Sequence, residues 1–130
     1  MTDTPQNGRC RILVVEDEML IALMIEDALT DLGCEMVGPA STLEAAMTLA
    51  AEKPLHAAFL DVTIRGGEVF PVAERLLERG VPFVFSSGYG DWALPVAFRG
   101  YRRLVKPFTG AELTDMIETL RRDASWPETA

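Results

Sequence analysis

Short runs of consecutive apolar residues recur along the chain and alternate with stretches of a different period. Such runs are typical of strands that are buried on both faces of a sheet. They predict five strands, at Ile12–Val15, Glu35–Val37, Ala57–Asp61, Pro82–Phe85 and Leu104–Val105. Strands of this kind need a cover on each face, so helices are expected between them.

The intervening stretches place apolar residues three and four positions apart, which is the spacing of a helix with one buried face. They predict helices at Met19–Leu32, from Ser41 or Thr42 to the residue before Pro54, at Val69–Arg79 and at Gly110–Asp123. Gly33 and Gly80 follow two of these helices, and glycine is a common residue after a helix C-terminus. The stretch Asp91–Gly100 has Pro95 in its middle, so we expect only a short or irregular fourth helix there.

This alternation predicts an α/β fold, because right-handed crossovers lay successive strands parallel with helices on both faces of the sheet. The expected architecture is a doubly wound, flavodoxin-like parallel sheet of five strands in the order 2-1-3-4-5. One domain at residues 10–123 is expected, since a chain of 130 residues suits a single core. Residues 1–9 are expected to form a disordered lead-in and residues 124–130 a C-terminal tail.

Carboxylates stand at the ends of two of the apolar strands. The first strand runs into Glu16, Asp17 and Glu18, and the third stops on Asp61. In the expected strand order the first and third strands are neighbours, and their ends flank the crevice where such sheets bind ligands. Carboxylates gathered there need either raised pKa values or a hard divalent cation. Mg²⁺ is the expected cation, because it prefers a few carboxylate oxygens together with water and phosphate oxygens.

The fourth and fifth strands bring two further polar groups to the same edge. They are Ser86 or Ser87 and Lys106. With Mg²⁺ and a lysine to neutralise the oxygens of a phosphoryl group, Asp61 is expected to act as its nucleophilic acceptor. Taken alone, an aspartate at a strand end is more often a helix cap or a turn residue, so the functional interpretation depends on the combination. His56 precedes the third strand, away from the crevice, and is expected to have no catalytic role.

The composition limits the partners and the location. Twelve Lys and Arg against twenty Asp and Glu give a net charge of −8, which disfavours direct binding to nucleic acid or to an anionic membrane. No apolar stretch approaches the roughly 20 residues that span a bilayer. With no signal-peptide pattern, we expect a soluble, cytoplasmic protein in which Cys10 and Cys34 are reduced core thiols.

Four motifs at the strand ends carry a resemblance. They read Val14-Val15-Glu16-Asp17-Glu18, Phe59-Leu60-Asp61, Phe85-Ser86-Ser87-Gly88 and Val105-Lys106-Pro107-Phe108. In this order, and over about residues 11–122, the chain resembles the receiver domain of two-component response regulators. Each motif alone is weak, and four of them at the expected strand ends are specific.

The resemblance implies a role for each matching residue. Asp61 would be the phosphoacceptor, and Ser87 and Lys106 would be the switch hydroxyl and the cation that pairs with the phosphoryl group. The implied Mg²⁺ ligands are Glu16, Asp17, Asp61 and the carbonyl of Thr63. The Lys106-Pro107 peptide bond would be cis.

The chain also resembles a subset of stand-alone receivers with a Phe-x-Thr-Gly-Tyr stretch, here residues Phe85–Tyr89, followed by Leu94-Pro95. It departs from typical receivers in two places. Arg103 stands where a Tyr or Phe usually serves as a rotating switch, and Tyr101 lies two residues earlier. The loop Ile64–Gly67 lacks the common Met-Pro pair.

The function predicted from this resemblance is that of a single-domain response regulator. A histidine kinase or phosphotransfer protein would donate the phosphoryl group, and the output would be a contact with an unknown downstream protein, a relay step or a phosphate sink. It would not be an enzyme beyond catalysing its own phosphorylation and dephosphorylation. A phosphorylation-independent protein-binding module remains an alternative. A Mg²⁺-dependent aspartyl phosphohydrolase is another, although it needs a second carboxylate where Thr63 stands.

The first predicted helix is apolar at every position of Met19–Ile25, which is more than one buried stripe requires. Met19, Leu20 and Leu23 are in surplus. We hypothesise that they contact the helical phosphodonor domain of a histidine kinase, and the alternative is partial burial under neighbouring loops.

Overall fold

The computed structural model describes residues 10–88 and 94–123 of the chain. The expectations for residues 1–9 and 124–130, for Tyr89, and for positions 91–93 of the irregular segment lie outside these residues. No helix in the described ranges is long and apolar enough to cross a membrane.

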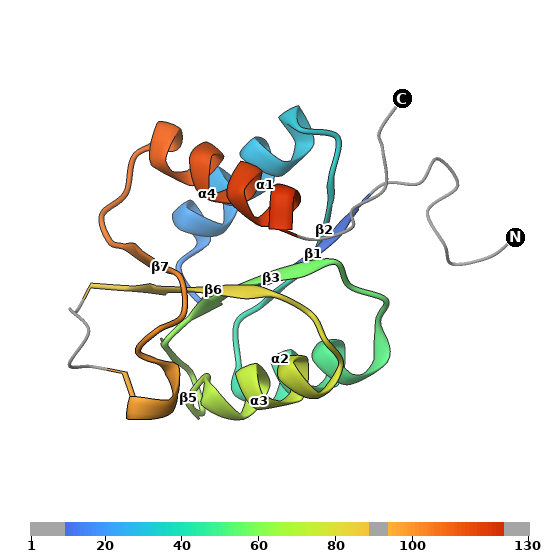
Figure 1. The fold of residues 1–130 in the computed structure, drawn as a ribbon, viewed down its shortest axis with the longest axis vertical. Helices are drawn as coiled ribbons and strands as arrows, with labels where there is room; N and C mark the ends of the chain where they lie inside the picture. Colours follow the sequence, from blue (N-terminus) through green and yellow to red (C-terminus); the bar gives the residue numbers. More distant parts are fainter. Residues whose placement is uncertain (1–9, 89–93, 124–130) are drawn as a thin grey trace, which may run out of the picture.

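Five parallel strands form the central sheet (Figure 1). They are β1 (Arg11–Val15), β2 (Glu35–Ala40), β3 (Ala57–Asp61), β6 (Phe83–Ser87) and β7 (Arg103–Val105). Their order across the sheet is β2-β1-β3-β6-β7. Counted among the parallel strands alone, this is the predicted order 2-1-3-4-5, so the predicted fold class is confirmed.

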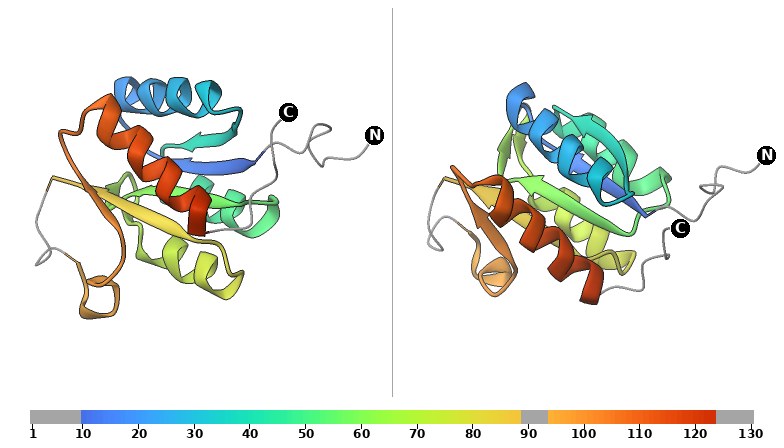
Figure 2. Two further views of the ribbon diagram at one scale, coloured as in Figure 1. Left: turned by 45° about the horizontal axis from the view of Figure 1, so that its top comes forward. Right: turned by 90° about the horizontal axis from the view of Figure 1, so that it is seen from above.

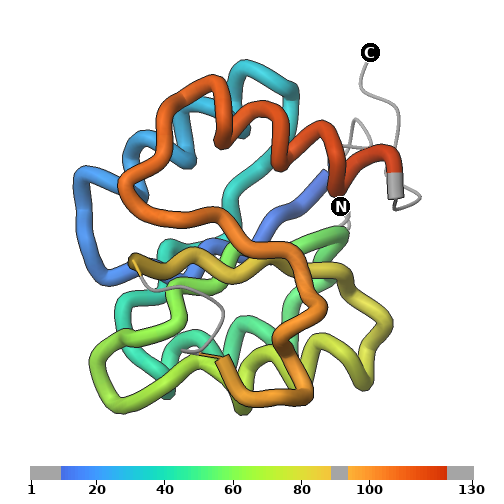
Figure 3. The backbone as a smooth tube through the Cα atoms, turned by 60° about the vertical axis from the view of Figure 1, so that its left-hand side comes forward, coloured from blue at the N-terminus to red at the C-terminus, as the bar shows by residue number. Residues whose placement is uncertain are grey.

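Four α-helices cover the two faces of the sheet. They are α1 (Met19–Asp31), α2 (Leu43–Glu52), α3 (Phe70–Glu78) and α4 (Gly110–Asp123). Helices α1 and α4 lie together on one face and α2 and α3 on the other (Figures 1 and 2). Figure 3 shows the same layers from another side, with the blue and red helices above the sheet and the green ones below it.

The buried strand β3 shows why both faces need a cover. All five of its residues are buried. Ala58 and Leu60 pack in the core under α2 and α3, whereas Ala57 and Phe59 pack in the core under α1 and α4. This alternation follows from the two-residue period of a strand, and it explains why the sequence of β3 is a continuous apolar run.

Side-chain hydrogen bonds cap the starts of two helices. The Oγ1 atom of Thr42 accepts a hydrogen bond from the backbone N–H of Ala45, at 3.1 Å, which confirms Thr42 as the cap of α2. Before α4, Thr109 and Glu112 exchange hydrogen bonds between side chain and backbone N–H in both directions. The irregular helix expected around Pro95 is a 3₁₀ helix, η2 (Val96–Phe98), within the described residues.

The loop after β3 contains a small hairpin that the periodicity did not predict. Its strands are β4 (Thr63–Ile64) and β5 (Gly67–Glu68), which pair antiparallel. Gly66 and Gly67 have φ values of +96° and +141°, which favour glycine. The backbone N–H of Leu43 donates to the carbonyl of Arg65 at 2.8 Å, so the hairpin is attached to the start of α2.

The prediction that Cys10 and Cys34 are reduced thiols is wrong for this structure, because the two form a disulfide. The prediction that both are buried in the core is right. Arg11 of β1 pairs with Glu35 of β2, so the residues just before these two strands meet with their Cα atoms 4.9 Å apart. The sequence does not show this proximity, since a separation of 24 residues says nothing about strand register.

Candidate functional site

Three carboxylates meet at the carboxyl edge of the sheet. Val15 of β1 pairs with Leu60 of β3, so the next residue of each strand brings Glu16 beside Asp61. One oxygen each of Glu16, Asp17 and Asp61 lie within 4.8 Å of one another. Glu16 and Asp61 are only 3% and 7% exposed, and Asp17 is half-buried. The predicted proximity of these three carboxylates is therefore confirmed.

Lys106 reaches the same carboxylates from the end of β7. Its Nζ atom lies 3.3 Å from a carboxylate oxygen of Glu16, 3.4 Å from Asp61 Oδ2 and 3.3 Å from Glu18 Oε1. The backbone N–H of Lys106 donates to the carbonyl of Ser87 at 2.8 Å, which places the start of the lysine side chain. The Lys106-Pro107 peptide is cis, as the resemblance implies, and Gly38-Pro39 is a second cis peptide that the sequence analysis did not predict.

The serines that follow Phe85 lie at the end of β6. Ser86 pairs directly with Asp61 in the sheet, and both Ser86 and Ser87 are buried. The Ser86 hydroxyl has no hydrogen-bond partner among the described residues. The assignment of Ser87 as the switch hydroxyl stays a prediction.

Burial and neighbouring charges change the pKa of Asp61 and of Lys106. Burial raises the pKa of Asp61 to about 7, the negative charge of Glu16 acts in the same direction, and Lys106 opposes both. Burial by itself would lower the pKa of Lys106, but the charges of Asp61 and Glu16 raise it, so the lysine stays protonated. The crevice therefore has more buried negative charge than one lysine neutralises, and a divalent cation would relieve it.

The donor set fits Mg²⁺. Glu16, Asp17 and Asp61 offer only carboxylate oxygens, which are ligands that hard cations prefer over nitrogen or sulfur. Thr63 is the second residue after Asp61 and lies in β4, where it pairs with Glu68 of β5 in the hairpin. The assignment of the Thr63 carbonyl as a further Mg²⁺ ligand stays a prediction.

His56 lies before β3, at the opposite end of this strand from Asp61. Its Nδ1 atom accepts a hydrogen bond from the backbone N–H of Arg11 at 2.9 Å. Burial and the charge of Arg11 lower the pKa of His56. The histidine therefore connects β1 to the segment before β3 in its neutral form.

An aromatic cluster under β6 was missed by the sequence analysis. Its members are Phe70, Phe83, Phe85, Phe98 and Tyr101. The rings of Phe83 and Tyr101 stack with centroids 5.1 Å apart and planes 5° from parallel. The alternation of Phe83 and Phe85 was the available signal, since it places both rings on one face of the strand. Tyr101 is thus attached to the strand that ends in Ser86 and Ser87.

Proteins of known description are similar to this chain in sequence or in fold. No protein-family model matches the chain. The chain is 26% identical over 119 residues to a probable chemotaxis protein CheY of Rhizobium etli, covering 86% of this chain and 92% of that protein. It is 32% identical over 123 residues to the probable transcriptional regulator ycf27 of Cyanophora paradoxa, covering 90% of this chain and 50% of the relative, so it spans half of that protein. Several solved structures with this fold are receiver domains of response regulators.

The chain belongs to the receiver-domain family of response regulators, the proteins of two-component signalling. A particular similarity is to SdrG from Sphingomonas melonis Fr1, with 40% identity and a TM-score of 0.75 over 87% of this chain and 97% of SdrG. An SdrG structure in its BeF₃-activated conformation is 42% identical, with a TM-score of 0.71 over 85% of this chain and 94% of that one.

Proposed function

We propose that this chain is a single-domain response regulator that accepts a phosphoryl group on Asp61, from the phosphohistidine of a histidine kinase or a phosphotransfer protein. The observation that carries the proposal is the position of Asp61. It lies at the end of a buried strand, beside Glu16 and Asp17, with the Lys106 Nζ atom 3.4 Å from its Oδ2 atom. A helix cap or turn residue would need neither the neighbouring carboxylates nor the lysine.

The chemistry proposed for the site is the transfer of a phosphoryl group from a histidine nitrogen to an aspartate oxygen. An oxygen of ionised Asp61 forms a bond to phosphorus while the bond from phosphorus to the histidine nitrogen breaks, which leaves an aspartyl phosphate. Mg²⁺, held by Glu16, Asp17, Asp61 and the Thr63 carbonyl, would neutralise charge on the phosphoryl oxygens. Lys106 exchanges its contact with Asp61 for a contact with the phosphoryl group, and Ser87 donates its hydroxyl hydrogen to it.

The position of the acidic crevice supports the proposal that the phosphodonor protein contacts α1. Glu18 directly precedes this helix, and Met19, Leu20 and Leu23 at its start are 64%, 82% and 47% exposed. They are therefore not covered by loops within the described part of the chain. Large apolar side chains that stay in water beside a reactive centre favour a protein contact at that place.

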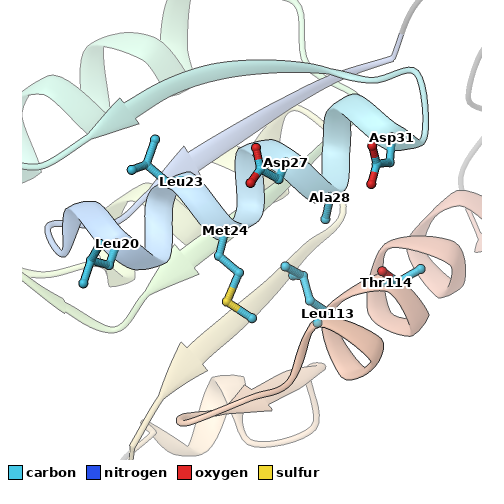
Figure 4. Close-up of a pocket in the computed structure, with 9 residues that line it drawn as sticks. Leu20, Leu23, Met24, Asp27, Ala28, Asp31, Leu113 and Thr114 are labelled. Atoms are coloured by element: carbon cyan, nitrogen blue, oxygen red, sulfur yellow. The ribbon is translucent and has the colours of Figure 1, made fainter.

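A groove continues this apolar surface between α1 and α4. Its volume is about 500 Å³, and its lining includes Leu20, Met24 and Leu113. Figure 4 shows the Met24 and Leu113 side chains between the two helices, with Asp27 and Asp31 farther along α1. The proposed donor is helical, because a helix can place apolar side chains along such a groove while its histidine reaches Asp61.

The downstream output is proposed to be a contact with another protein, a relay step or the draining of phosphate from a kinase, in the cytoplasm. The net charge of −8 supports protein partners over nucleic acid or an anionic membrane. Thr63 gives no support to a phosphohydrolase, which needs a carboxylate at that position to protonate its leaving group.

The test compares two phosphodonors. The purified chain is incubated with Mg²⁺ and either acetyl phosphate or a purified phosphotransfer domain phosphorylated on histidine, and the covalent phosphate is followed by intact mass. We expect labelling of the wild type and of Asp115→Asn, an equivalent change at an exposed position of α4, and none of Asp61→Asn. Absence of the adduct with both donors would favour the phosphorylation-independent binding module, and turnover of a small phosphoester would favour the phosphohydrolase.

Two variants of α1 test the proposed contact with the phosphodonor protein. Leu20→Asp and Leu23→Asp should remain labelled by acetyl phosphate but lose transfer from the phosphohistidine protein. Val96→Asp is the matched control, because Val96 is also strongly exposed but lies on η2. Unchanged protein-to-protein transfer in both α1 variants would contradict the proposed contact.

A further inference from the structure

The Cys10–Cys34 disulfide encloses the first strand and the first helix of the domain. Cys10 directly precedes β1, and Cys34 directly precedes β2. The 24-residue separation between them spans β1, the acidic segment 16–18 and the whole of α1. The link thus closes a loop that contains two of the three clustered carboxylates and the exposed apolar side chains of α1.

We propose that this disulfide is a reversible, redox-sensitive link that controls how firmly the segment from β1 to α1 is held. The inference does not rest on phosphoryl transfer. It rests on the position of the two cysteines, their burial and the loop that they close.

Backbone contacts hold the two cysteines near each other independently of the sulfur bond. The N–H of Glu35 donates to the carbonyl of Cys10 at 2.8 Å, and the N–H of Cys34 donates to the carbonyl of Leu29 at 2.8 Å. Both side chains also belong to the buried core under α1 and α4. The sheet and the end of α1 therefore keep the thiols adjacent after reduction, and this favours formation of the bond again.

The redox step is a thiol–disulfide exchange with a small-molecule disulfide such as oxidised glutathione. One cysteine thiolate attacks the glutathione disulfide and releases one glutathione thiolate, and the second cysteine thiolate then displaces the other. The S–S bond of the oxidant breaks, the bond between Cys10 and Cys34 forms, and the two cysteines lose two electrons and two protons in total. Reduction by excess glutathione reverses both steps.

Access to the buried sulfurs requires a local opening of the sheet. Cys34 is joined to β2, which is the outermost strand on its side of the sheet. Edge elements open at lower free energy than the centre of a domain, so exchange can proceed without global unfolding. The closed loop then opposes further opening, and for a loop of this size chain entropy predicts an effect on the order of a hundredfold on the opening equilibrium.

The test uses the wild-type protein equilibrated in glutathione buffers that range from fully reduced to fully oxidised. Alkylation followed by mass measurement counts free thiols, and amide hydrogen exchange reports the opening of each helix. We expect both thiols to disappear as the buffer becomes oxidising. Exchange in α1 should slow by roughly tenfold to a hundredfold, and by more than exchange in α3, which lies outside the loop.

The variant Cys34→Ala is the control, since it cannot form the link: its remaining thiol can form a mixed disulfide with glutathione, but its exchange in α1 should not show the slowing expected of the closed loop. Because the main comparison uses one chain in two redox states, it does not depend on that variant folding. Two free thiols in the most oxidising buffer would overturn the proposal, as would equal α1 exchange in both states.

Discussion

Replacing Asp61 by Asn tests the electrostatics of the crevice, because the change keeps the shape of the side chain and removes its charge. Without Mg²⁺, burial together with the charge of Glu16 raises the pKa of Asp61 from its ordinary value of 3.8 to about 7. Between these two values the native state binds more protons than the unfolded chain, so stability falls as the pH rises through this window. The variant Asp61→Asn should therefore be more stable than the wild type, most clearly above pH 7.

The magnitude follows from the size of the pKa difference. A shift of about three pH units corresponds to about 4 kcal/mol at about 1.4 kcal/mol per unit. Asp61 lies at the edge of the sheet with Lys106 beside it, and solvent screening there reduces the effect. We therefore expect the substitution to raise the free energy of unfolding by about 1 to 3 kcal/mol above pH 7, and by much less near pH 4.

Urea denaturation in the presence of a chelator measures this difference. Wild type, Asp61→Asn and the control Asp115→Asn are compared at about pH 5 and at about pH 8. Added Mg²⁺ should stabilise the wild type more than Asp61→Asn, because a ligand that binds only the folded state raises its stability. A gain of the same size at both pH values, or a loss of stability at the higher one, would refute the reasoning.

Three further predictions concern Lys106, Asp17 and His56. Lys106→Gln leaves Asp61 and Glu16 buried without their cation, so it should lower the free energy of unfolding by about 1 to 3 kcal/mol near neutral pH, measured by urea denaturation with a chelator; no loss would contradict the ion pairs. Asp17→Asn should weaken Mg²⁺ binding about tenfold or more by isothermal titration calorimetry, whereas Asp27→Asn on α1 should leave it unchanged. His56 has a lowered pKa in the fold, so stability should fall as the pH drops below about 6.5, the range where the unfolded chain takes up the proton. His56→Gln should remove that part of the pH dependence, and an unaltered urea profile between about pH 5 and 7 would show that another group is responsible.

The predictable part of the structure is the part that burial dictates. The run Ala57–Leu60 is apolar at each position because β3 is covered on both faces, and this pattern is visible without coordinates. Parallel strands with helical crossovers leave few possible orders, so the meeting of Glu16, Asp17 and Asp61 could be predicted as well.

The rest depends on register and on contacts between distant residues. The strands β4 and β5 have two residues each, which is too short for a period to appear. The Cys10–Cys34 pair depends on how β1 and β2 align, and the stacking of Tyr101 on Phe83 joins residues of different segments. Such contacts form only once the sheet is assembled, so no local sequence pattern predicts them.

Position 103 is an arginine instead of an aromatic residue, but aromatic rings pack together next to the end of β6. Phe85 directly precedes the two serines of β6, and its ring packs edge-on against Phe70 and Phe98. Tyr101 lies beside Phe98 at the surface of the same cluster, and it is partly exposed. Contacts between Phe85, Phe98 and Tyr101 thus form a continuous row of packed rings from β6 to the surface.

The most direct test of the account is to locate the phosphoryl group. The chain is treated with acetyl phosphate and Mg²⁺, the acyl phosphate is reduced with borohydride to give a stable mark, and the modified residue is found by peptide mass spectrometry. The account predicts a mark at Asp61 that disappears when Mg²⁺ is chelated. A mark at Glu16 or Asp17, or no mark in protein shown to be folded, would contradict it.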